Sequence, residues 1–248
     1  MEKYLKYTID ETTLTNICNS VRNSLDIEDK LLCSDIPDKI DNIITLKKFI
    51  LDEVSELDLP YMQEVLPNFF SQRKNLLYVK LDNVVEISDY AFTSSSIAKF
   101  NVPKTCIYLG TAAFKGCSNL SEFTFNNDTR VNVINSQLLS GGYKVKYLKL
   151  PKSINTLSDG AFRGCGLAEV DADNLTTIGP NAFFKSAYFK TLILRTNKIC
   201  NLQSTSAFTD TILSDIYVPD SLVDTYKQGT NWTAFSNKIK PLSEYQSK

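Results

Sequence analysis

Residues able to do catalytic chemistry are few in this sequence, and their spacing matches no common active site. The chain has no histidine, which removes the side chain that most often acts as a general base, triad member or metal ligand. It also lacks the glycine-rich loops that bind phosphates and the Gly-x-Ser-x-Gly turn of many hydrolases. Acidic residues are scattered, without a recurring pair suited to glycoside hydrolysis. The sequence therefore predicts a protein that is not an enzyme and has no catalytic residues, cofactor or metal site.

The six cysteines are the other chemically reactive side chains, at positions 18, 33, 106, 117, 165 and 200. No two are spaced as Cys-x-x-Cys, so a zinc or redox motif of that type is absent. Cys117 and Cys165 follow the matching triplets Phe-Lys-Gly and Phe-Arg-Gly. A small buried core residue explains this match most simply, and a disulfide between some pair is the alternative.

A different set of side chains is suited to recognition, because tyrosine combines an aromatic face with a hydroxyl group and is common at interfaces. The candidate binding residues are Tyr78, Lys80, Lys99, Asn101, Tyr147, Lys149 and Tyr217. Each lies in a short segment in which apolar and polar residues alternate. Side chains alternate across a strand, so these residues point outward if their segments are strands. A strand face that is merely solvated is the alternative for each of them.

The segments that carry these residues belong to a repeat. Its first phrase has three apolar residues, such as Leu76, Val79 and Leu81, and begins at residues 54, 76, 97, 120, 145, 167, 189 and 213. Its second phrase ends in an aromatic residue, such as Phe92, with Leu139 in that place in the fourth unit. A fixed period of this length indicates a solenoid, in which each coil buries its apolar faces against its neighbours.

The spacing within a unit predicts the elements of one coil. The first phrase predicts a short strand, and eight stacked strands form a parallel ladder roughly 34 Å long. The second phrase predicts a tight helical turn whose aromatic residue fills the opposite side of the coil. The fourth unit is the longest, with 25 residues to the next start. Its loop from Asn126 to Asn132 is therefore expected to bulge from the stack.

Helical segments are predicted outside the repeats at both ends. Residues 10–25 and the segment from Asp35 have approximately helical spacing of apolar residues, and helices this short need a partner. They would either shield the first coil or attach the protein to another chain. After the last repeat, Asp220 or Ser221 is expected to cap a helix, and Trp232 to cover the final coil.

The expected domains are thus a helical attachment or cap module over residues 1–45, a solenoid over 46–218 and a C-terminal helical cap over 219–248. The formal net charge of −1 gives no electrostatic case for binding nucleic acid or an anionic membrane. No run of 18 apolar residues is present, so membrane insertion is not predicted. The first ten residues lack the apolar core and cleavage site of a secretory signal, so classical secretion is not expected.

Four segments carry a resemblance to a known family: Ile-Ser-Asp-Tyr-Ala-Phe (87–92), Leu-Gly-Thr-Ala-Ala-Phe-Lys-Gly-Cys (109–117), Leu-Ser-Asp-Gly-Ala-Phe-Arg-Gly-Cys (157–165) and Ile-Gly-Pro-Asn-Ala-Phe (178–183). They resemble the BspA-like class of leucine-rich repeats. The resemblance implies an α/β solenoid of leucine-rich repeats of about 22 residues with a parallel β ladder. The family is rich in surface adhesins and in phage or prophage structural proteins, but a fold does not name an activity.

A second resemblance concerns the N-terminal region. Thr-Leu-Thr-Asn-Ile-Cys-Asn-Ser-Val-Arg (13–22) with Cys-Ser-Asp-Ile-Pro-Asp-Lys-Ile-Asp-Asn-Ile (33–43) resembles a helix pair at the front of many bacteriophage virion proteins. It implies a non-enzymatic virion protein, in the tail or baseplate or decorating the capsid, made in the host cytoplasm.

The partners implied by this second resemblance are other virion proteins held by the N-terminal helices, further copies of the chain in the particle, and a host surface glycan or protein bound by the repeats. A bacterial BspA-like adhesin or interaction module outside a virion is the alternative function.

Overall fold

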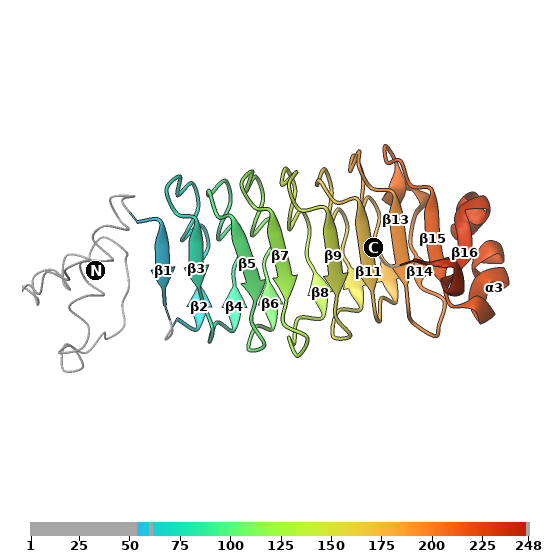
Figure 1. The fold of residues 1–248 in the computed structure, drawn as a ribbon, viewed down its shortest axis with the longest axis horizontal. Helices are drawn as coiled ribbons and strands as arrows, with labels where there is room; N and C mark the ends of the chain where they lie inside the picture. Colours follow the sequence, from blue (N-terminus) through green and yellow to red (C-terminus); the bar gives the residue numbers. More distant parts are fainter. Residues whose placement is uncertain (1–53, 60–61, 247–248) are drawn as a thin grey trace, which may run out of the picture. The chain divides into compact units, whose positions relative to one another are not determined.

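The computed structural model describes residues 54–59 and 62–246, which form successive coils of one solenoid (Figure 1). The helices expected at residues 10–25 and from Asp35, and with them the whole 1–45 module, lie outside the described residues.

Each unit contributes one strand to a parallel ladder, here called the main ladder. Its strands are β1 (Glu56–Asp58), β3 (Tyr78–Lys80), β5 (Lys99–Val102), β7 (Glu122–Phe125), β9 (Tyr147–Leu150), β11 (Glu169–Ala172), β13 (Thr191–Leu194), β15 (Asp215–Val218) and β16 (Ile239–Pro241). The register places Leu57 opposite Val79 and Leu148 opposite Val170. The central apolar residue of each strand from β3 to β13 is at most 3% exposed. The predicted parallel ladder with its buried row is confirmed.

A second parallel ladder, made of strands of only two residues, was not predicted. Its strands are β2 (Glu64–Val65), β4 (Glu86–Ile87), β6 (Tyr108–Leu109), β8 (Val133–Ile134), β10 (Thr156–Leu157), β12 (Thr177–Ile178) and β14 (Asn201–Leu202). The apolar residue that opens each second phrase, such as Ile87 or Leu157, is the buried residue of its strand.

The aromatic phrase forms a hydrogen-bonded turn rather than the expected helical turn, except that η2 (Thr205–Phe208) in the seventh unit is a 3-10 helix. Around Phe92, both Tyr90 and Ser94 have positive φ, at 59° and 58°. The N–H groups of these three residues donate to carbonyls of the next coil at 2.9, 2.7 and 2.7 Å. These N–H groups thus bond to carbonyls of the next coil, whereas in a helical turn they would bond to carbonyls of the same turn. The helical expectation was wrong for this reason.

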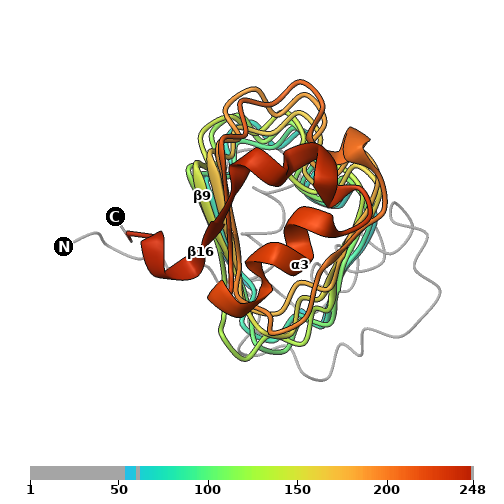
Figure 2. The ribbon, with the colours of Figure 1, turned by 90° about the vertical axis from the view of Figure 1, so that its right-hand side faces the viewer.

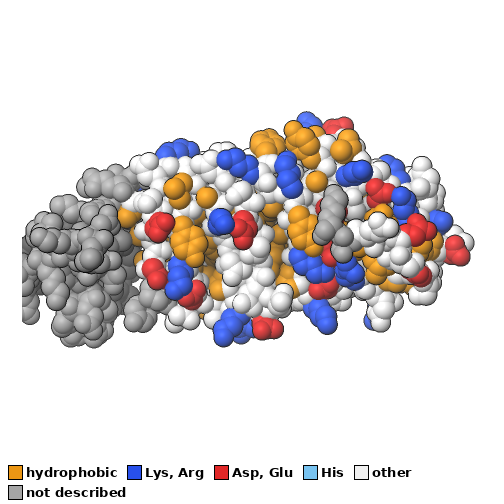
Figure 3. Space-filling model, in the orientation of Figure 1, with side chains coloured by type: hydrophobic (Ala, Val, Ile, Leu, Met, Phe, Trp, Pro, Cys, Tyr) orange, Lys and Arg blue, Asp and Glu red, His pale blue; other side chains and the backbone are white. Residues whose placement is uncertain are grey.

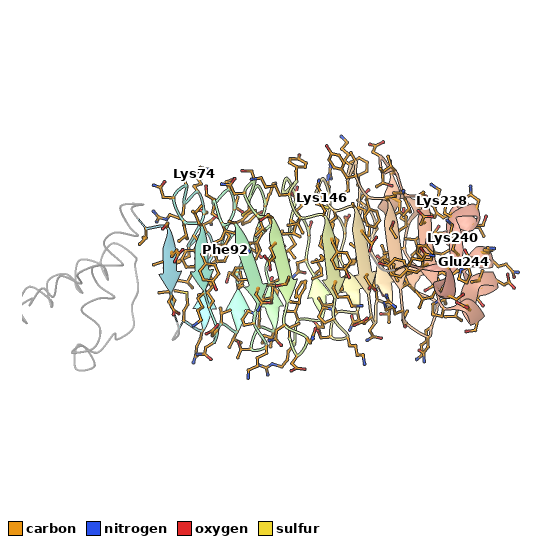
Figure 4. The ribbon with its side chains drawn as sticks, viewed as in Figure 1. Lys74, Phe92, Lys146, Lys238, Lys240 and Glu244 are labelled. Atoms are coloured by element: carbon orange, nitrogen blue, oxygen red, sulfur yellow. The ribbon has the colours of Figure 1, made fainter. Side chains whose placement is uncertain are left out.

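Stacked aromatic rings fill the core behind these turns. Phe92 lies 4.8 Å, between ring centroids, from both Phe70 and Phe114. In the later units Phe183 lies 5.6 Å from both Phe162 and Phe208. Figure 4 shows Phe92 inside the stack. Because Leu139 replaces the aromatic residue in the fourth unit, the column has two aromatic parts separated by an aliphatic side chain.

The cysteines of the described region are free and buried: Cys106, Cys117, Cys165 and Cys200. The Cys117 thiol donates to the Phe92 carbonyl at 3.0 Å, and Ser186 donates in the same way to the Phe162 carbonyl at 2.7 Å. Burial raises the pKa of Cys117 to about 11. The prediction of a buried core position at Cys117 and Cys165 is confirmed; Cys18 and Cys33 lie outside the described residues.

Both ladders are interrupted at the fourth unit. β9 is not paired with β7, and β8 is not paired with β6. Figure 1 shows β7 and β9 farther apart than the strands on either side of them. The Asn126–Asn132 loop only partly bulges, because Thr129 and Val131 within it are buried. The main ladder also divides between β3 and β5, but there the Ala98 N–H still donates to the Leu77 carbonyl at 2.8 Å.

Short helices close the C-terminal end of the stack (Figure 2). They are η3 (Asp220–Leu222), α3 (Val223–Gln228) and η4 (Trp232–Lys238), followed by β16 and η5 (Leu242–Glu244). The Trp232 indole donates to the Cys200 carbonyl at 2.7 Å. Neither Asp220 nor Ser221 caps a helix, contrary to expectation. Asp220 instead accepts the Ser243 N–H at 3.0 Å, because it lies within η3 and its carboxylate faces the later segment.

Candidate binding surface

All seven predicted binding residues lie on one face of the main ladder, here called the outer face. Tyr78 and Tyr147 are 43% and 50% exposed. Both occupy the first outward column, since Tyr78 pairs with Glu56 and Tyr147 with Glu169. Lys99 and Asn101 are exposed, whereas Lys80, Lys149 and Tyr217 are half-buried. The structure therefore brings the predicted residues together but does not expose them equally.

The lysines of the outer face are paired with acidic residues of neighbouring strands. Lys99 lies 2.9 Å from Glu122, which is opposite it in register. Lys149 lies 3.1 Å from Asp171, also opposite it. Figure 3 shows acidic and basic side chains interspersed over this face. The exposed Lys99–Glu122 pair adds little stability. Both pairs nevertheless neutralise the lysine charges, so the face presents aromatic rings and hydrogen-bonding groups rather than a uniform positive field.

Lys80 has two acidic neighbours, Asp58 at 3.5 Å and Asp82 at 3.0 Å. The hydrogen bond to Asp82 is the main reason that the pKa of Lys80 is raised above its ordinary value. Lys80 is thus charged, and its charge is already paired with carboxylates, as are the charges of Lys99 and Lys149.

The last strands of the outer face are covered by the protein's own C-terminal segment. This segment, Leu242–Gln246, is here called the C-terminal strap; it follows β16 and runs back over the main ladder (Figures 1 and 2). The Tyr245 hydroxyl donates to Glu169 at 2.7 Å, and its ring lies 5.2 Å from that of Tyr217. Figure 4 shows Lys240 and Glu244 close together where the strap begins.

The strap corrects the sequence-based expectation for this end of the face. Alternation along β11 and β13 would leave Asp171 and Ile193 exposed on the outer face, yet Asp171 is 5% exposed and Ile193 is fully buried. Tyr217 is also withdrawn from solvent by its contact with Tyr245. The strap contacts residues far away in sequence, 76 positions in the case of Tyr245 and Glu169. Periodicity within the repeats therefore gave no signal for it.

Beneath the strap, charged groups form a small network around Asp171. Arg195 donates two hydrogen bonds to this carboxylate, at 2.7 and 3.0 Å. This hydrogen bonding is the main reason that the pKa of Arg195 is raised. Burial, followed by the nearby charge of Asp171, raises the pKa of Tyr147. The network ends at Tyr147, where the covered part of the outer face meets the open part.

A shallow cleft of about 160 Å³ opens at the interruption between β7 and β9. Its lining residues are Phe123, Thr124, Phe125, Asn127, Tyr147, Lys149 and Pro151. Sequence reasoning identified Tyr147 and Lys149 but missed the rest of the lining. The available signal was the long spacing of the fourth unit, which was interpreted as a loop and not as a separation of strands.

Two kinds of site are absent from the described residues. Among residues 54–59 and 62–246, no three cysteine, aspartate or glutamate side chains are grouped so that they could hold a metal ion. Within the same ranges, no helix has both the length and the apolar character needed to cross a bilayer.

Comparison with known proteins identifies the family to which these coils belong. The family model described as "BspA type Leucine rich repeat region (6 copies)" matches residues 42–168 and 128–239. The chain is a BspA-type leucine-rich repeat protein. The match overlaps the segments that resemble virion proteins only at residues 42 and 43, so it has no bearing on that second resemblance. Among curated proteins, none matches this BspA-type chain significantly.

A solved structure shows the same fold, and two others match parts of the chain less closely. The pneumococcal vaccine antigen PcpA is 20% identical over 67% of this chain and 51% of its own, with a TM-score of 0.51. A leucine-rich cell surface protein from Faecalibacterium prausnitzii is 20% identical, with coverages of 79% and 62% and a TM-score of 0.41. A leucine-rich repeat protein from Bacteroides ovatus is 16% identical, with coverages of 68% and 56% and a TM-score of 0.43. This chain spans between half and two thirds of the length of these structures.

Proposed function

We propose that this BspA-type protein is a non-enzymatic binding module, and that the open part of its outer face, from β1 to β9, recognises a protein or glycan. The observation that carries the proposal is the pair of exposed tyrosines, Tyr78 and Tyr147, held in one column of a parallel ladder. Side chains fixed by a ladder lose little conformational freedom on binding, so weak contacts on several strands add together. Amphipathic rings beside hydrogen-bonding groups suit sugars and polypeptides alike.

The test is a double substitution, Tyr78→Ala with Tyr147→Ala, in the full chain. Ligands are first selected from a glycan array and from a displayed random-peptide library, and their affinities are then measured by calorimetry. The double variant should bind the selected ligand at least about ten-fold more weakly, since two aromatic contacts are lost. Tyr188→Ala is the matched control, because Tyr188 is 54% exposed but lies outside the outer face. Unchanged affinity in the double variant, or no selected ligand at all, would contradict the proposal.

We further propose that the module acts in a bacteriophage virion, as a tail, baseplate or capsid-decorating protein. The resemblance of residues 13–22 and 33–43 to virion proteins supports this setting. The N-terminal helices would hold the protein to other virion proteins and to further copies of itself, leaving the repeats to contact a host surface. Deletion of residues 1–45 should then leave the repeats folded and abolish incorporation into particles. Incorporation of the truncated protein at normal copy number would place the attachment elsewhere.

The alternative, a BspA-like adhesin or interaction module outside a virion, is compatible with the family to which the chain belongs. Mass spectrometry of purified particles separates the two settings, because a virion protein is recovered at stoichiometric amounts. Both settings use the same outer face, so the double tyrosine substitution tests the binding function in either one.

A further inference from the structure

The cleft between β7 and β9 is an apolar recess in an otherwise mixed outer face. Phe123 and Phe125, whose ring centroids are 5.4 Å apart, lie on its β7 side. Tyr147 and Pro151 contribute from the β9 side. The recess exists because β7 and β9 are not paired. Phe123 and Phe125 are 2% and 9% exposed and Tyr147 is 50% exposed, so a side chain from another molecule would lie against the Tyr147 ring and the exposed edge of Phe125.

Two polar side chains of the cleft, Thr124 and Lys149, are already engaged. The Thr124 hydroxyl donates to Asn101 at 3.0 Å. The Lys149 ammonium group contacts Asp171 at 3.1 Å and also Asp173. A sugar would bring many hydroxyl groups that need partners on burial, and an unmatched buried polar group is costly. The cleft is therefore better suited to an apolar ring than to a sugar.

The neighbouring strands show what kind of molecule this face holds. The C-terminal strap is a stretch of polypeptide that lies on the same face from β15 to β11, with one aromatic side chain, Tyr245, against it. Tyr245 occupies a site directly beside the cleft. Its hydroxyl donates to Glu169 on β11, and Glu169 lies opposite Tyr147 of the cleft in register.

We infer that the cleft between β7 and β9 binds an aromatic side chain of a polypeptide partner, on the path that the strap follows over the later strands. The inference rests on the proposed function and names the class of partner. Tyr147 forms one wall of the site, Phe123 and Phe125 the other, and Asn127 lies at its rim.

The probe is the peptide acetyl-Leu-Ser-Glu-Tyr-Gln-amide, which copies the strap sequence, compared with the same peptide carrying alanine in place of tyrosine. Binding to the full-length, isotope-labelled protein is followed by NMR through the amide signals of Thr124 and Asn127, which lie on the side of the cleft away from the strap. The tyrosine peptide should shift these signals in a saturable way, and the alanine peptide should have at least a ten-fold weaker effect.

Variants assign the binding to the cleft. Tyr147→Ala and, independently, Asn127→Arg should each weaken binding of the tyrosine peptide at least ten-fold, and both positions are exposed enough to leave the core intact. Tyr188→Ala is the matched control, because Tyr188 is 54% exposed but lies outside the outer face. Equal effects of the two peptides, or equal losses in Tyr188→Ala and Tyr147→Ala, would overturn the inference.

A sugar arm separates this inference from the proposed function. Methyl α-glucoside is titrated under the same conditions. Shifts at Thr124 and Asn127 with the glycoside but not with the tyrosine peptide would overturn the polypeptide inference and leave the outer face as a binding surface. The proposed function fails on different evidence, namely unchanged ligand affinity when Tyr78 and Tyr147 are both replaced.

Discussion

Asn135 shows how one side chain maintains contact between coils where the backbone cannot. In regular units the backbone N–H at this position donates to the preceding coil, as from Gly110 to the Ile87 carbonyl at 2.7 Å. At the fourth unit the strands are separated, and the Asn135 side-chain amide donates to the Leu109 carbonyl at 2.8 Å instead. The longer reach of a side chain thus satisfies a buried acceptor across the interruption.

Replacing Asn135 with alanine should leave that acceptor without its donor. We expect Asn135→Ala to lower the free energy of unfolding by about 1–3 kcal/mol, the usual cost of an unsatisfied buried group. Urea denaturation followed by circular dichroism measures the change. Asn132→Ala is the control, because the Asn132 side chain is exposed. Equal stability of the two variants would show that the Leu109 carbonyl is satisfied by water.

The aromatic column gives a second prediction at the residue scale. Phe162 is fully buried and contacts Phe183, so Phe162→Ala should lower the free energy of unfolding by about 3–5 kcal/mol. Phe184→Ala provides the comparison, since Phe184 is only half-buried and contacts the Arg163 guanidinium at 4.9 Å. A loss below about 1 kcal/mol in Phe162→Ala would be that of a surface position and would show that the column is not core.

At the scale of the element, the strands of the main ladder were predictable and the second ladder was not. Spacing such as that of Leu76, Val79 and Leu81 fixes a strand because two of the three share a face. In the second phrase the opening apolar residue and the aromatic are five positions apart, as with Ile87 and Phe92, so its pattern contains no alternation. Its strands of two residues form because stacking places equivalent backbone segments of neighbouring coils side by side. Their formation therefore depends on the stack and not on the sequence of the segment.

The candidate site was predictable only in its regular part. The alternation rule placed Tyr78 and Tyr147 on the outer face correctly. The rule failed at Tyr217 and Ile193, because the strap that covers them follows the last repeat. Its docking depends on tertiary contacts that no local pattern specifies.

The strap should contribute measurably to stability. The strap contacts Tyr217 on β15 and Glu169 on β11, so it crosses β13, where Ile193 is fully buried. Deleting residues 242–248 removes both contacts and should expose Ile193. Exposing a buried isoleucine costs about 1.5–3 kcal/mol, so the truncated protein should lose about that much unfolding free energy in urea. Tyr245→Phe is the matched variant: it keeps the ring and loses only the hydrogen bond to Glu169, for a cost of about 0.5–1.5 kcal/mol. A truncated protein as stable as the full chain would mean that the strap lies on the face without binding it.

At the scale of the whole molecule, the fourth unit separates two parts of the solenoid. Both ladders are interrupted there, and Leu139 interrupts the aromatic column between Phe114 and Phe162. What continues across is mainly the set of turn hydrogen bonds, such as that from the Phe114 N–H to the Leu138 carbonyl at 3.0 Å. In a repeat protein the coupling between neighbouring units determines how far unfolding spreads. Weak coupling at one interface should therefore divide the stack into two cooperative units.

Native-state hydrogen exchange in increasing urea tests this division. Amides of β3, β5 and β7 should exchange with one opening free energy, and those of β9, β11 and β13 with a higher one. The later group includes the longest uninterrupted sheet, from β9 to β16, and is closed by the C-terminal helices. Removing Asn127 and Asp128, which are exposed, shortens the fourth unit toward the common period. If this variant re-forms the pairing of β7 with β9, the two free energies should converge. A single opening free energy for both groups in the unaltered chain would show instead that the turn hydrogen bonds alone couple the whole stack.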